Sequence, residues 1–217
     1  MVLNVQMKMS YSTIMTYDRI PAMTPPVVLD HLRDLGRTWT KRGVGVELGC
    51  WLGATAAALL SGLKDVGYDR PFYCYDRWTA NESEVKKAHE QGTEISINEN
   101  LLPLFLKNVD YDNIRAYRGS IFQIIHNYPG DPIEFCLFDA PKRSNIFNEA
   151  VEVLSPYWIP GVTVLGLMDY YFYEHRKDFQ RFMAPVQFMK KYKDNFSIIS
   201  EWRKESTSVF FKYERRL

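Results

Sequence analysis

Short apolar runs alternate along the chain with longer segments whose apolar residues follow helical spacing. The apolar runs predict five strands, at residues 44–48, 71–76, 113–118, 133–139 and 162–169. The other segments predict helices at residues 27–35, after Gly53, and at 101–109, 121–125, 148–154 and 174–193, the last bent near Pro185. Two alternating runs, 196–202 and 206–212, predict a terminal hairpin. This order predicts an α/β fold, with a doubly wound, mostly parallel seven-stranded sheet and a C-terminal antiparallel hairpin.

A glycine-rich turn, Glu47-x-Gly49-x-x-x-Gly53, joins the first strand to its helix. Glycine in such a turn allows a positive φ and lets a ligand approach the main chain closely. An ordinary strand-to-helix turn is the plain alternative, because glycine pairs are common. The acid two residues before the first glycine favours a binding turn. The spacing differs from the G-x-G-x-x-G turn that binds a dinucleotide pyrophosphate.

Four of the predicted strands end on a carboxylate, at Glu47, Asp76, Asp139 and Asp169. The carboxyl ends of parallel strands meet at one edge of the sheet, where ligands of open α/β sheets bind. A single acid there is explained as a helix cap. Four acids at one edge favour a site whose partners are hydroxyl groups or a cation.

Composition narrows the class of protein further. A chain of 217 residues with 46% hydrophobic residues suits one domain. Its formal net charge of +1 gives no electrostatic reason to expect nucleic acid or an acidic membrane as partner. By their spacing, Cys50, Cys74 and Cys136 fit neither a zinc site nor a disulfide framework, which favours reduced thiols in a cytoplasmic protein. We predict no signal peptide and no membrane-spanning segment.

The pattern also suggests a division of the chain. Residues 1–24 lack periodicity and are interpreted as an arm or cap, followed by one domain over residues 25–217. Within it, the polar stretch 77–100 is longer than a usual connection between a strand and a helix. A lid over the site and a fixed, solvated helix explain this stretch equally well.

The turn from Glu47 to Gly53 resembles motif I of the class I S-adenosylmethionine-dependent methyltransferases, and Asp76 matches the family's acid at the end of the second strand. The resemblance covers about residues 43–213 and implies a Rossmann-like fold that binds S-adenosylmethionine. It implies that Asp76 accepts hydrogen bonds from both ribose hydroxyls. Ser120 falls where the family contacts adenine, although a helix N-cap explains it as well. The cofactor-binding residues implied are Glu47, Gly49, Trp51, Gly53, Asp76, Arg77, Gly119, Ser120 and Asp139.

Within that class, the chain looks most like the small-molecule O-methyltransferases of the catechol and macrocin type. The match lies in Asp139-Ala140-Pro141-Lys142 and in Asp169 after the fifth strand. In metal-dependent members, two such acids bind Mg²⁺ and the lysine deprotonates the acceptor hydroxyl, which fits the general chemistry of both groups. The resemblance thus implies Asp139 and Asp169 as metal ligands and Lys142 with Asp139 as catalytic residues. His175 is a competing base.

Two departures from the family pattern leave the metal open. Tyr170 follows Asp169 where many relatives have Asn or Asp, and Pro141 is unusual beside a catalytic lysine. Lys142 is also explained as a surface lysine beside Arg143.

The acceptor implied is a small molecule, with a sugar hydroxyl of a glycosylated natural product or glycan first and a phenolic hydroxyl next. The aromatic run 170–173 would supply a stacking wall, although core packing explains part of it. An alternative is a methyltransferase-like nucleotide-binding module that lacks catalysis and acts through a partner. The turn spacing disfavours a third interpretation, a nicotinamide-dependent enzyme. The sequence leaves a homodimer open.

Overall fold

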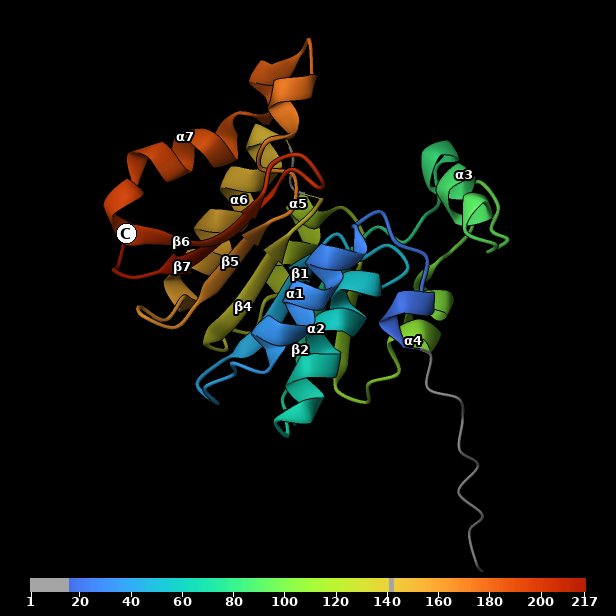
Figure 1. The fold of residues 1–217 in the computed structure, drawn as a ribbon, viewed down its shortest axis with the longest axis horizontal. Coiled ribbons are helices and arrows are strands. Elements are labelled where there is room, and N and C mark those ends of the chain that lie inside the picture. Colours follow the sequence, from blue (N-terminus) through green and yellow to red (C-terminus); the bar gives the residue numbers. More distant parts are fainter. Residues whose placement is uncertain (1–15, 141–142) are drawn as a thin grey trace, which may run out of the picture.

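The computed structural model of this protein describes residues 16–140 and 143–217, in which seven strands form one sheet. The strands are β1 (Val44–Leu48), β2 (Phe72–Asp76), β3 (Ile114–Arg118), β4 (Ile133–Phe138), β5 (Val164–Leu167), β6 (Phe196–Trp202) and β7 (Ser208–Tyr213). Their order across the sheet is β3-β2-β1-β4-β5-β7-β6 (Figure 1). The first five are parallel, and β7 pairs antiparallel with both β5 and β6. The predicted fold class is confirmed.

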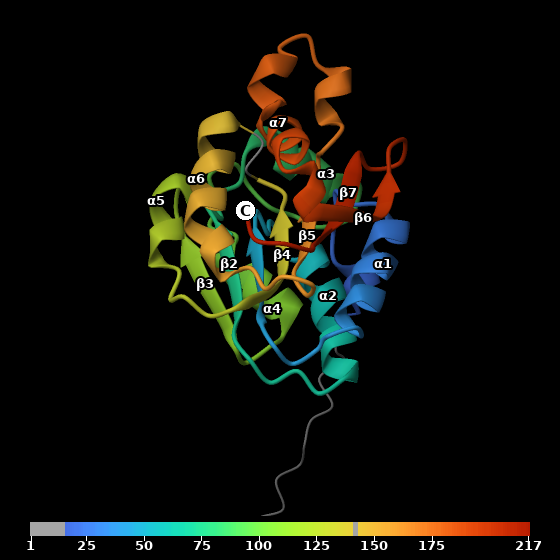
Figure 2. The ribbon, with the colours of Figure 1, turned by 90° about the vertical axis from the view of Figure 1, so that its left-hand side faces the viewer.

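Helices lie on both faces of this sheet. The helices of the described residues are α1 (Pro26–Gly36), α2 (Ala54–Asp65), α3 (Glu82–Glu90), α4 (Leu102–Val109), α5 (Ile121–Ile124), α6 (Ser144–Leu154) and α7 (Ala184–Lys191), of which α3 does not pack on the sheet (Figure 1). One buried core includes Leu32 of α1, Leu59 of α2 and Phe105 of α4. The other includes Phe147 of α6 and Met189 of α7. Figure 2 shows α1 and α2 on the opposite side of the strands from α5 and α6. The strand order reverses between β1 and β4, so a ligand site is expected at the carboxyl ends of these strands.

The polar stretch 77–100 contains α3, which stands away from the sheet (Figure 1). Asn81 caps this helix: its side chain accepts a hydrogen bond from the Glu84 amide, and the Glu84 side chain accepts one from the Asn81 amide. Gln91, just after the helix, exchanges two hydrogen bonds of 2.9 Å with the backbone of Ala22. The stretch therefore contains a capped helix that is hydrogen-bonded to the segment before α1 through Gln91, and its movement as a lid stays a prediction.

The prediction of one long helix over residues 174–193 is wrong. The segment instead forms two 3₁₀ turns, Phe172–His175 and Phe179–Phe182, followed by α7. Pro185 lies in the first turn of α7. Backbone N–H groups in the first turn make no intrahelical hydrogen bond, so a proline is tolerated there and does not bend the helix. The helix predicted at 148–154 is also longer, because α6 begins at Ser144. Of the predicted arm, residues 1–15 lie outside the described residues.

Candidate cofactor and acceptor site

The turn between β1 and α2 requires its two glycines. Gly49 and Gly53 have φ values of 95° and 93°, in the left-handed region that favours glycine. A Cβ on Gly49 would lie 2.5 Å from the Ala140 amide nitrogen, and one on Gly53 would lie 2.6 Å from a methyl of Val109. The positive φ values expected of the two glycines are confirmed, and the turn is packed tightly against both neighbours.

Asp76, at the end of β2, holds this turn in place. Its Oδ2 accepts hydrogen bonds from the amides of Cys50 (2.7 Å) and Trp51 (2.9 Å). Its Oδ1 accepts one from the amide of Trp78 (2.7 Å). A carboxylate offers about four acceptor positions, so a ribose diol that needs two of them must displace a backbone donor. The role of Asp76 in ribose binding stays a prediction.

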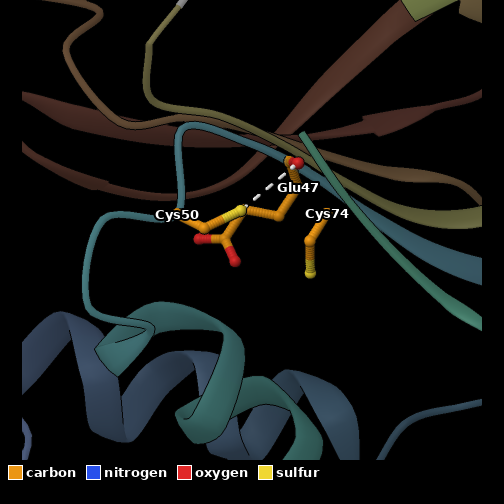
Figure 3. A group of neighbouring side chains, drawn as sticks. All are labelled: Glu47, Cys50 and Cys74. Carbon is orange, nitrogen blue, oxygen red and sulfur yellow. Dashed lines mark hydrogen bonds between the residues drawn. The ribbon is translucent and has the colours of Figure 1, made fainter. Parts of the chain in front are cut away.

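Glu47 lies below the turn and is fully buried. The Thr55 hydroxyl donates to its Oε1, and Oε2 has no hydrogen-bond partner within the described part of the chain. Burial raises the pKa of this carboxyl to about 8, and the negative charges of Asp139 and Asp76 contribute to the rise. Figure 3 shows that the Glu47 side chain lies beside Cys50 and Cys74. Its carboxyl lines neither of the two cavities described next.

A cavity of about 520 Å³ opens at the ends of β2 and β3, and we call it the β2–β3 cavity. It brings together four residues expected to bind the cofactor, Asp76, Arg77, Gly119 and Ser120. Ser120 occupies the N-cap position of α5, as the alternative explanation expected, but its side chain makes no capping hydrogen bond. The full lining is Asp76, Arg77, Glu84, Gly119, Ser120, Ile121, Ala140 and Ile146.

Glu84 is a lining residue that the sequence reading did not single out. Its Oε1 pairs with an Arg77 guanidinium nitrogen at 2.7 Å, and its Oε2 accepts from the Asn81 amide at 2.8 Å. The pair ties α3 to the edge of the β2–β3 cavity. The pattern Asn81-x-x-Glu84 is a capping-box signature and would have located the start of the helix, though not its contact with the site.

A second, smaller cavity of about 20 Å³ lies at the ends of β4 and β5, and we call it the β4–β5 cavity. It brings together Asp139 and Asp169, both half-buried, among aromatic side chains. Its lining is Phe138, Asp139, Phe147, Leu167, Asp169, Tyr170, Phe172, Phe182 and Pro185. The two cavities adjoin along the chain, since residues 139 and 147 line one and residues 140 and 146 the other.

Aromatic rings close the outer side of the β4–β5 cavity. Phe172 and Phe182 meet edge to face at 5.3 Å, and the Arg176 guanidinium lies 5.5 and 5.6 Å from their ring centres. Tyr170 packs on Phe211 at 5.5 Å, and burial raises the pKa of its hydroxyl to about 12. Part of the aromatic run therefore fills the core, and part of it faces the cavity.

The described residues include the two predicted metal ligands but neither of the predicted bases in full. Lys142 lies outside the described residues, and so does the side chain of His175. Among the described residues, Asp139 and Asp169 are not joined by a third His, Cys, Asp or Glu close enough to share a metal with them. An acid pair of this kind suits a hard cation such as Mg²⁺ but falls short of a complete protein ligand set. The metal and the base stay predictions.

Solved structures of methyltransferases share this fold. No family model and no curated protein matches the chain. The O-methyltransferase NovP matches with a TM-score of 0.63 and 15% identity, over 87% of this chain and 80% of that one. CalS11, a TDP-rhamnose 3'-O-methyltransferase in calicheamicin biosynthesis, matches with a TM-score of 0.55 and 14% identity, over 87% of this chain and 78% of that one. The SAH-bound Podospora anserina methyltransferase PaMTH1 matches with a TM-score of 0.58 and 13% identity, over 91% of this chain and 81% of that one.

These structures have the fold that the resemblance implied for the present chain. Within the described residues, no helix is long and apolar enough to cross a bilayer. The seven-stranded sheet with its antiparallel end and the match to these enzymes lead to one conclusion. The chain has the Rossmann-like fold of the class I S-adenosylmethionine-dependent O-methyltransferases.

Proposed function

We propose that this protein transfers the methyl group of S-adenosylmethionine to a hydroxyl oxygen of a small molecule. The observation that carries the proposal is the pair of adjoining cavities at the carboxyl ends of the parallel strands. The β2–β3 cavity has an acid, a glycine and a serine where the family holds adenosine. The β4–β5 cavity has two acids and an aromatic wall where an acceptor would meet the donor methyl, and at about 20 Å³ it would have to widen to admit one. A sugar hydroxyl is our first choice of acceptor, because CalS11, with the same fold, acts on TDP-rhamnose.

The reaction is an in-line displacement in which the acceptor oxygen bonds to the methyl carbon as the carbon–sulfur bond breaks. The products are the methyl ether and S-adenosylhomocysteine, and the hydroxyl proton passes to a base. The work of the fold is to hold oxygen, methyl and sulfur collinear and to exclude water. Asp76 would bind the ribose, while Asp139 and Asp169 would orient the acceptor hydroxyl.

The base is expected to be Lys142, with His175 as the competing choice. If Mg²⁺ binds, Asp139 and Asp169 would hold it, and the ion would lower the pKa of the acceptor hydroxyl. Without the ion, a lysine beside two carboxylates would balance their charge.

Calorimetry with S-adenosylmethionine, S-adenosylhomocysteine and NAD tests the donor. We expect the two sulfur compounds to bind and NAD not to bind. Tight NAD binding with no binding of either sulfur compound would refute the proposal. Mass spectrometry of a panel of nucleotide sugars, free glycosides and phenols then tests the transfer itself. Donor binding with no methylated product from any acceptor would favour the non-catalytic binding module.

A further inference from the structure

A compact group of side chains lies below the glycine turn, outside both cavities. Glu47 is paired in register with Cys74 across β1 and β2, so the two side chains project from the same face of the sheet. Cys50 follows three residues after Glu47, in the turn. One oxygen of Glu47 and both sulfur atoms lie within 4.8 Å of one another (Figure 3). We propose that Glu47, Cys50 and Cys74 form a binding site for a thiophilic divalent cation, with Zn²⁺ the best fit.

The donor set selects the kind of cation. Two sulfur ligands and one carboxylate oxygen suit Zn²⁺, whereas Mg²⁺ and Ca²⁺ prefer oxygen alone. The three residues would fill three of the four positions of a tetrahedral zinc. This site would therefore be chemically distinct from the acid pair Asp139 and Asp169, which suits a hard cation.

The Glu47 carboxyl is already oriented for such a role. The Thr55 hydroxyl donates to Oε1, as an outer partner of a metal-binding carboxylate does. Oε2 is buried and has no hydrogen-bond partner among the described residues, although buried polar atoms are nearly always paired. A cation bound to this oxygen and to the two sulfur atoms would supply the missing partner.

The geometry requires only a small closure. Ligand atoms about 2.0–2.3 Å from a tetrahedral zinc lie at most about 3.8 Å apart, so the cluster must contract by about 1 Å or less. The contacts of the Cys50 thiol with the carbonyls of Glu47 and Tyr75 are long, at 3.7 and 4.0 Å. These weak bonds leave its side chain able to adjust.

A cation here would stiffen the turn that the proposed donor site depends on. The amide of Cys50 donates to Asp76, so a fixed Cys50 also fixes the ribose acceptor. Because all three ligands are almost fully buried, we expect the ion to enter as the chain folds and to exchange slowly afterwards.

Refolding the full-length protein with Co²⁺ and a thiol-free reductant tests the site, because Co²⁺ bound to thiolate has a characteristic charge-transfer absorption. We expect one cobalt per chain with this absorption, displacement by Zn²⁺, and a higher melting temperature with either ion. Thr55→Val should weaken binding about 10–100-fold.

The third cysteine provides the matched control. Cys136 is also completely buried, in β4, but is not a member of the cluster. Cys74→Ala should abolish the charge-transfer band, and Cys136→Ala should keep it. A second readout needs no variant: Zn²⁺ should protect Cys50 and Cys74, but not Cys136, from alkylation in mild denaturant.

Two results would overturn the site. The first is wild-type protein that refolds fully in Co²⁺ without the charge-transfer band. The second is a Cys50–Cys74 disulfide in the isolated protein, together with no metal uptake after reduction, which would make the two cysteines a redox pair. Both are independent of donor binding, so failure here and failure of the proposed methyl transfer are separate results.

Discussion

Asp76 is the residue on which the donor site depends most, because it joins the turn to β2 through two backbone donors, Cys50 and Trp51, and accepts a third hydrogen bond from Trp78. In Asp76→Asn, one oxygen becomes an amide nitrogen that cannot accept a hydrogen bond. We expect S-adenosylmethionine to bind at least about tenfold more weakly, and the free energy of unfolding to fall by about 1–3 kcal/mol. Calorimetry and urea unfolding measure the two effects. The exposed Asp112→Asn is the control, and unchanged affinity in Asp76→Asn would refute the ribose role.

His31 gives the protein a pH-dependent stability. Its ring lies on α1 between Trp202 (4.7 Å) and Phe210 (5.0 Å) and shares a 2.8 Å hydrogen bond with Ser200. Burial lowers the pKa of this imidazole, and the nearby Asp34 opposes the shift only in part. The neutral ring is therefore favoured in the folded state. Its stabilising effect is present above the unfolded pKa of about 6.5 and is lost as the pH falls below it.

The prediction is that stability declines between pH 7 and pH 5 and that His31→Gln flattens this part of the curve. Urea unfolding at several pH values measures it. The exposed His126, which pairs with Glu149 at 2.9 Å, supplies the control variant His126→Gln. Parallel curves for wild type and His31→Gln would show that another group controls the decline.

At the scale of elements, α3 is the helix whose mobility the proposed function predicts to change. The Arg77–Glu84 pair places the helix at the mouth of the β2–β3 cavity, so donor binding should slow its exchange. We expect hydrogen exchange in residues 77–100 to slow when S-adenosylhomocysteine binds. Glu84→Gln should reduce that protection, while Glu82→Gln, at an exposed position in the same turn, should not. Exchange that is equally slow with and without ligand would leave a fixed, solvated helix.

The elements differ in how far the sequence predicts them. Buried strands such as β1 and β2 are continuous apolar runs bounded by turns, so their bounds are readable from the pattern. Residues 174–193 also have helical spacing, but Arg176 and Phe182 contact Phe172 and each other, and the segment forms two 3₁₀ turns before α7. The grouping of Glu47, Cys50 and Cys74 depends on strand register, and spacing along one chain cannot show it.

At the scale of the whole molecule, the two cavities predict separable effects on binding and on turnover. Of the two described cavities, Asp169 lines the β4–β5 cavity and not the β2–β3 cavity, so Asp169→Asn should lower turnover by about 100-fold or more while donor affinity stays within about twofold. Steady-state kinetics and calorimetry on the same preparation measure both. Full turnover of the wild type in excess chelator would exclude the Mg²⁺ site and leave Lys142 or His175 as the base. A parallel loss of donor affinity would mean that the cavities act as one.

The hydrogen bonds to Asp76 have an optical consequence. Two of its three donors are the amides of tryptophans, and the Trp78 indole in turn donates to the Trp51 carbonyl at 3.1 Å. Any ribose that displaces one of these amides must shift an indole, and indole emission changes with its surroundings. Donor titration should therefore change the intrinsic fluorescence, with most of the change lost in Trp51→Phe and kept in Trp158→Phe, on the far face of the sheet. The tryptophans beside the donor site would therefore report donor binding without an added fluorophore.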